Sequence, residues 1–257
     1  MRRTTVRRTA VAASAVSLAL LMSACGGSGK SEAKDEPKDK ASSSAPAAPA
    51  GKGASQAELE KLVLTDADVP GRKVTEATPA DLATAKGVSA DKAECKPLVD
   101  AMSLRSGGTP AATVIRKVLP PAPSAAPGAS DEDKMKAGLG ALSGTLTSDT
   151  LGSYGDDKAA GEVIAALKKS GADCAGGFTL VSGSDKTKFA KVAPADLTAG
   201  DEAVAFTLAM DLDGKAGTTH LVAVRKGATV ATFYALSLAG QAEQPKAVVD
   251  AQVKKLG

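Results

Sequence analysis

The chain has 257 residues, of which 43% are hydrophobic and 24% are charged, and its formal net charge at pH 7 is +3. Four arginines stand within the first eight residues, and without that segment the formal charge is −1, which gives no electrostatic case for nucleic-acid binding. Aromatic residues make up 2% of the chain and Trp is absent, which weighs against carbohydrate sites and aromatic cages for quaternary amines.

Residues 1–24 are predicted to be a secretory signal peptide. The early arginines precede the apolar run Ala10–Met22, which is about 13 residues long, whereas a membrane-spanning helix needs about 20. The segment Met22-Ser23-Ala24-Cys25 resembles the lipobox of bacterial lipoproteins, a family in which the chain is cut before the cysteine and its thiol carries acyl chains such as palmitate. The resemblance implies a lipid anchor on Cys25 and a place on the outer face of the cytoplasmic membrane. The alternative is a secreted protein without lipid, cut near Ala24.

Residues 25–55 are predicted to be the lipidated cysteine and a disordered linker. Glycine and serine, the mixed-charge run Lys30–Lys40 and the Ala/Pro stretch Ala45–Ala50 show no apolar periodicity, so burial cannot offset the ordering entropy. A flexible chain of ~30 residues spans about 30 Å. The linker would therefore hold the folded part in the cell-wall zone.

Residues 56–257 have the composition of one globular domain, and its first half mixes helices and strands. Apolar residues at helical spacing predict helices at 57–64 and 93–102, and β-branched runs predict strands at 72–74 and 112–119. Residues 120–133 are rich in Pro, Ala and Ser and are predicted to form a loop.

The second half is predicted to consist mainly of strands joined by hairpins. Strands are predicted at 142–151, 178–181, 203–212, 219–225 and 229–238, and helices at 156–169 and from Pro245 to the C-terminus. Asp213-Gly214 is a hairpin turn signal. We therefore expect an α+β fold, a single antiparallel β-sheet with helices packed on one face.

Cys95 and Cys174 are the cysteines that remain after Cys25. Because an extracytoplasmic environment favours oxidation, they are predicted to form one internal disulfide. The bond would join segments on both sides of the loop at 120–133, which favours a single domain. The alternative is a catalytic or metal-binding thiol pair, although redox motifs usually place two residues between the cysteines.

No residue pattern indicates catalysis. His220, the single histidine, lies in a predicted strand, and one histidine cannot build the usual zinc site of a hydrolase. A Gly-x-Ser-x-Gly elbow is absent, since Gly140–Gly144 has its serine one place late. The segment Asp211–Gly214 fits a hairpin turn better than a calcium loop. We expect no catalytic residue, no metal and no cofactor.

Several short segments together resemble a family of actinobacterial secreted lipoproteins, which are similar to the extracellular sensor domains of mycobacterial serine/threonine kinases. The segments are Leu64–Gly71, Cys95 with Pro97–Val99, Cys174–Phe178, Gly200–Val204, Val224–Arg225 and Val230–Phe233. The resemblance implies an α+β domain with a cleft and ligand sensing. It carries over no functional residue, and the kinase sensors have two disulfides where this chain can form one.

The sequence thus predicts a non-catalytic, membrane-anchored module at the cell envelope. A cleft between sheet and helices would bind a small molecule, a lipid or a cell-wall fragment, through residues that the sequence does not identify. The alternative is a structural or partner-binding accessory lipoprotein, and a third candidate is a cell-envelope hydrolase.

Overall fold

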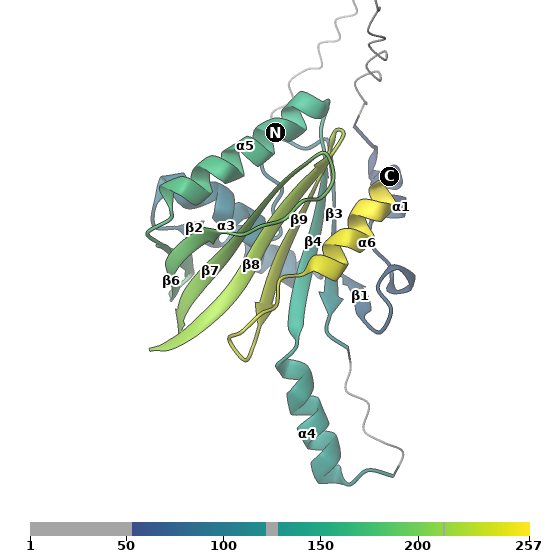
Figure 1. The fold of residues 1–257 in the computed structure, drawn as a ribbon, viewed down its shortest axis with the longest axis vertical. Helices are drawn as coiled ribbons and strands as arrows, with labels where there is room; N and C mark the ends of the chain where they lie inside the picture. Colours follow the sequence, from purple (N-terminus) through teal and green to yellow (C-terminus); the bar gives the residue numbers. More distant parts are fainter. Residues whose placement is uncertain (1–52, 122–127, 213) are drawn as a thin grey trace, which may run out of the picture. The chain divides into compact units, whose positions relative to one another are not determined.

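The computed structural model describes residues 53–121, 128–212 and 214–257 (Figure 1). The predicted signal peptide, Cys25 and nearly all of the predicted linker lie outside the described residues. Their cleavage and lipidation therefore stay predictions.

Nine antiparallel strands form one sheet, in the order β1-β3-β4-β9-β8-β7-β6-β5-β2. The long strands β4, β9, β8 and β7 lie side by side in its middle. The strands are β1 (Lys73–Glu76), β2 (Val88–Ala90), β3 (Ala112–Leu119), β4 (Thr145–Ser153), β5 (Phe178–Ser182), β6 (Asp185–Pro194), β7 (Glu202–Leu212), β8 (Lys215–Lys226) and β9 (Thr229–Ser237). The predicted α+β class and single antiparallel sheet are confirmed.

Six α-helices accompany the sheet in the described part of the chain: α1 (Gln56–Leu62), α2 (Pro79–Lys86), α3 (Lys96–Met102), α4 (Asp131–Leu142), α5 (Asp157–Asp173) and α6 (Lys246–Leu256). The start of α5 is capped by Asp156, whose side chain accepts a hydrogen bond from the Ala159 N–H at 2.8 Å. None of the described helices combines the length and hydropathy that crossing a bilayer requires.

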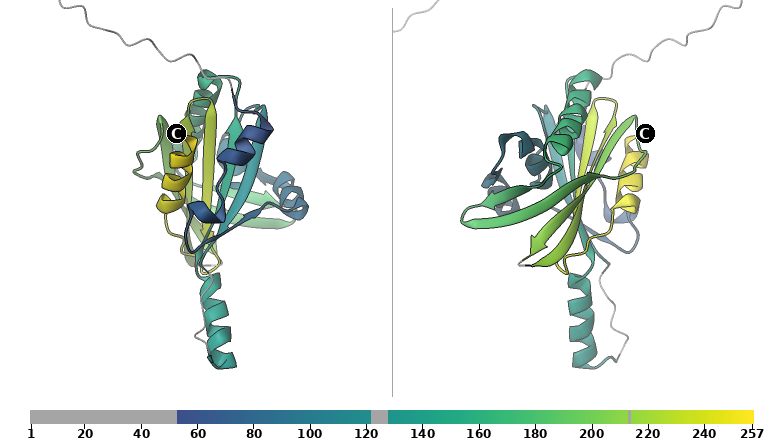
Figure 2. Two further views of the ribbon diagram at one scale, coloured as in Figure 1. Left: turned by 90° about the vertical axis from the view of Figure 1, so that its right-hand side faces the viewer. Right: turned by 60° about the vertical axis from the view of Figure 1, so that its left-hand side comes forward.

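The helices cover both faces of the sheet, so the expectation of helices on one face was wrong. Helices α3 and α5 pack on one face and α1 and α6 on the other, each pair over its own apolar cluster (Figure 2). The cause is visible in β8, where Leu221 and Ala223 face α3 and α5 while Val222 and Val224 face α1 and α6, all at most 1% exposed. A strand that is apolar at consecutive positions needs cover on both faces.

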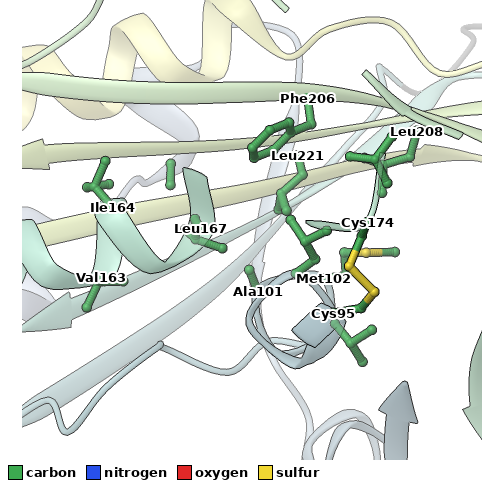
Figure 3. Close-up of a cluster of buried hydrophobic side chains, with 14 of the residues drawn as sticks. Cys95, Ala101, Met102, Val163, Ile164, Leu167, Cys174, Phe206, Leu208 and Leu221 are labelled. Carbon is green, nitrogen blue, oxygen red and sulfur yellow. A yellow bond between two sulfur atoms is a disulfide. The ribbon is translucent and has the colours of Figure 1, made fainter. Parts of the chain in front are cut away.

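The predicted disulfide joins Cys95 to Cys174, with 5.9 Å between their Cα atoms and no exposure of either residue (Figure 3). It links the start of α3 to the end of α5. Close by, the Ser170 hydroxyl of α5 donates a hydrogen bond to the Glu94 carbonyl at 2.7 Å. The two helices are thereby fixed together on the sheet.

Candidate functional site

A groove of about 470 Å³ opens on the α3/α5 face of the sheet, beside α2. We call it the α2 groove. Its floor consists of Leu146, Ser148, Tyr234 and Leu236, and its walls include Ala85, Val88, Met102, Leu104 and Leu180. Pockets for small molecules typically measure about 300–1,000 Å³ and are mainly apolar, so this groove has the size and character of a ligand site.

The floor follows from the pairing of β4 with β9. Leu146 lies opposite Leu236, and Ser148 lies opposite Tyr234. Because side chains alternate along a strand, these four point to the same face, and the residue between Leu146 and Ser148, Thr147, points to the α6 face.

Tyr234 supplies a phenol group to this floor. Burial raises the pKa of Tyr234 to about 12, and the nearby Thr219 hydroxyl opposes the shift. The phenol is therefore neutral at physiological pH and is able both to donate and to accept a hydrogen bond.

One wall of the groove is a strained turn after α3. Leu104 has φ 57°, the left-handed region that residues with a side chain rarely adopt, and it lines the groove. Such a conformation costs of order 1–3 kcal/mol and persists where surrounding contacts enforce it.

Arg105, the residue after Leu104, is bonded to three surrounding segments. Its guanidinium donates to Asp100 at 2.7 and 3.0 Å, to the Val88 carbonyl at 3.0 Å, and to the Ala85 carbonyl. The planar side chain of Arg105 thus connects the end of α3 with the end of α2 and the start of β2. Two of the residues that it contacts, Ala85 and Val88, belong to the groove wall.

An ion pair stands at the rim of the groove. Lys117 of β3 lies 2.5 Å from Asp81 of α2, and Asp81 also accepts hydrogen bonds from the N–H and hydroxyl of Thr78. The contact with Lys117, followed by those with Thr78, lowers the pKa of Asp81 to about 2. The groove therefore combines an apolar interior with one phenol and a charged rim, an arrangement suited to binding an amphipathic molecule.

A second crevice of about 310 Å³ lies between α3 and α5. Tyr154 lines it and donates its hydroxyl to the Gly107 carbonyl at 2.7 Å. Asp100 also lines this crevice while holding Arg105, so the two hollows share the α3 wall.

The residues weighed as candidates for chemistry lie away from the α2 groove. His220 Nε2 is 3.2 Å from the Ala242 carbonyl and its Nδ1 is 3.4 Å from the Thr207 hydroxyl. Burial lowers the pKa of His220. At the predicted hairpin turn, Asp211 accepts a hydrogen bond from the Gly214 N–H at 2.8 Å. In the described ranges, no three His, Cys, Asp or Glu residues gather as metal ligands would.

The sequence analysis missed Asp149 of β4. Its side chain is fully buried on the α1/α6 face, and neither carboxylate oxygen has a hydrogen-bond partner among the described residues. Burial raises the pKa of Asp149 well above its usual value, and Arg116 opposes the shift. The sequence feature that could have indicated this buried carboxylate is its position inside the polar run Thr147–Thr150 of a central strand.

In comparisons with known proteins, no family model and no curated protein matches the chain. Among solved structures, the extracellular domain of PknH from Mycobacterium tuberculosis matches with a TM-score of 0.48 and 12% sequence identity, over 80% of this chain and 97% of that one. This likeness carries no residue and no activity over to the chain.

Proposed function

We propose that the chain is a lipid-anchored, extracytoplasmic and non-catalytic module that binds one small amphipathic molecule in the α2 groove. The observation that carries the proposal is the cavity of about 470 Å³, whose walls are mostly apolar and whose charges lie at the rim. An apolar ligand body would contact Leu146, Leu180 and Leu236. A polar group on the ligand would meet the Tyr234 phenol or the Lys117–Asp81 pair.

Two features of the chain support the extracytoplasmic place. The signal-peptide pattern ends in a lipobox-like segment at Cys25. The buried Cys95–Cys174 disulfide is typical of proteins that fold outside the reducing cytoplasm. The intact mass of the exported chain tests the anchor: acyl chains on an N-terminal Cys25 support it, and an unmodified N-terminus at another residue refutes it.

The groove is tested with the chain as exported by a bacterial host. Native mass spectrometry looks for a co-purified ligand, and titration with the fluorescent fatty acid cis-parinaric acid measures binding. Leu146→Gln places an amide in the partly exposed floor and should weaken the probe about tenfold or more, since burying a leucine-sized apolar surface is worth about 1.5–3 kcal/mol.

Leu238→Gln is the matched control, because Leu238 is 74% exposed and lies outside the groove lining. It should leave the probe affinity unchanged. Absence of any co-purified ligand together with equal probe binding by both variants would refute the groove as the ligand site.

A further inference from the structure

A small polar pocket of about 100 Å³ lies at the N-terminus of α6, on the opposite face of the sheet from the α2 groove. We call it the α6 pocket. Thr147 lines it, whereas the next residue along β4, Ser148, lines the groove. The α6 pocket is therefore a separate site, and its occupancy does not depend on the proposed function of the groove.

The first turn of α6 points unsatisfied donors at this pocket. The helix has 11 residues and begins after Pro245, which supplies no side-chain cap. The Val249 N–H donates to the Pro245 carbonyl, but among the described residues no backbone acceptor is found for the N–H groups of Ala247 and Val248. Such free N–H groups, together with the helix dipole, make a helix N-terminus attract anions.

A second and independent observation is the hydroxyl of Thr147. The residue is 1% exposed, and in the stretches that the structure covers its Oγ1 has no hydrogen-bond partner. The large majority of buried side-chain polar atoms in proteins have a hydrogen-bond partner. Because Thr147 forms part of the pocket wall, the partner that its hydroxyl lacks would be a group inside the pocket.

The charges around the pocket include one cation that is free to bind. Within the described residues, the Arg72 guanidinium makes no ion pair or hydrogen bond, whereas Lys246 is engaged with Asp250 at 2.6 Å. Glu243 is the acid of the lining; its side chain is exposed, and its backbone N–H donates to the Thr145 hydroxyl at 2.9 Å. The fixed donors and Arg72 favour an anion, and Glu243 opposes it.

We propose that the α6 pocket binds a small oxyanion of the phosphate type, held by the N–H groups of α6, the Thr147 hydroxyl and Arg72. Its volume of about 100 Å³ is well below the roughly 300–1,000 Å³ of typical ligand pockets, which suits a small ion rather than a larger ligand. The phosphate would come either from solution or from a lipid headgroup, and the two sources are separated below.

Isothermal titration calorimetry of inorganic phosphate into the exported chain, in phosphate-free buffer, tests the site. Arg72→Gln should weaken binding about tenfold or more, as expected for a charge-assisted hydrogen bond. Glu243→Gln should strengthen binding several-fold. Lys73→Gln is the matched control, because it removes a neighbouring charge that is paired with Asp66 outside the pocket.

Thr147→Val separates a binding role from a structural one. It should weaken phosphate binding about fivefold without lowering the melting temperature, because the hydroxyl it removes has no partner within the fold. Probe binding in the α2 groove should stay unchanged. The proposal would be overturned if no heat of phosphate binding were measured, or if wild type and Thr147→Val bound phosphate with equal affinity. In either case the pocket would hold water rather than an anion.

A Cys25→Ser chain, which cannot carry the lipid anchor, is used to distinguish a lipid headgroup from free phosphate as the source of the anion. Co-sedimentation with phosphatidic acid vesicles, abolished by Arg72→Gln but kept by Lys73→Gln, assigns the site to lipid headgroups. Calorimetric binding of inorganic phosphate without vesicle binding assigns it to a free anion.

Discussion

Lys117 of β3 and Asp81 of α2 form an ion pair of 2.5 Å that fastens a helix to the sheet at the rim of the α2 groove. The side chains are 23% and 31% exposed, so the pair is only partly screened by solvent. The pair therefore bears on both the stability of the fold and the position of the groove wall.

Lys117→Gln should lower the free energy of unfolding by up to about 1 kcal/mol at pH 7. The pKa of Asp81 is lowered from 3.8 in the unfolded chain to about 2 in the fold, so its stabilisation is present above about pH 4 and is lost as the pH falls to about 2. Urea unfolding of both chains between pH 2 and pH 7 measures this. Lys134→Gln is the control, since its partner Asp131 is fully exposed; an effect of Lys117→Gln that does not fade in acid would contradict the prediction.

Removal of the disulfide should destabilise the domain strongly. The bond closes a sequence separation of 79 residues, for which the chain-entropy model gives roughly 4.5 kcal/mol as an upper figure. Cys95→Ala/Cys174→Ala should therefore lose about 2–5 kcal/mol of unfolding free energy in urea, and reductant should bring the wild type to the same value. Cys25→Ser serves as the control for loss of a cysteine outside the domain, and equal stability of all three chains would refute the prediction.

Asp149→Asn should stabilise the protein at pH 7. Because burial raises the pKa of Asp149 above 3.8, its ionisation opposes folding, and the penalty is absent below about pH 4 and grows as the pH rises toward the folded-state pKa. One unit of pKa shift equals about 1.4 kcal/mol, so a gain of more than about 1 kcal/mol is expected at pH 7 and little at pH 3. Arg116 is paired with Glu60 at 2.5 Å, so the substitution does not remove its ionic partner.

Urea unfolding at the two pH values checks this, with the exposed Asp196→Asn as control. A gain from Asp149→Asn that is the same at pH 3 and pH 7 would show that the carboxylate charge is not its cause.

Strong local patterns allowed much of the fold to be predicted from the sequence. The strand at 112–119 has the predicted bounds, and the helix predicted at 156–169 is observed as α5, Asp157–Asp173. By contrast, β6 was missed because only Phe189 and Val192 are buried among its exposed lysines. Helix α4 begins at Asp131, inside the predicted loop.

The α2 groove could not be predicted for a different reason. Its parts come from α2, β2, the end of α3 with the turn after it, β3, β4, β5 and β9, and they meet only because the sheet places β3 next to β4, β4 next to β9 and β2 next to β5. No local periodicity encodes such distant pairings. Helix α2 and strand β2 were not predicted from the sequence, and both line the groove. The sequence analysis therefore could not identify the site that their residues help to form.

Arg105→Lys tests whether the wall of the groove depends on one planar side chain. Lysine keeps the charge but cannot bond Asp100, Ala85 and Val88 at once, so the strained turn at Leu104 should relax. We expect a loss of about 1–2 kcal/mol in unfolding free energy and at least about a tenfold loss of cis-parinaric acid affinity.

Arg225→Lys is the matched control for Arg105→Lys. Arg225 pairs with Asp201 and Glu202, away from the groove lining, so its variant should lose some stability with no change in probe affinity. If both variants lowered stability equally and neither changed probe binding, Arg105 would stabilise the fold without shaping the site. A selective loss of affinity in Arg105→Lys would instead show that the contacts of Arg105 with Ala85, Val88 and Asp100 hold the groove wall in its binding geometry.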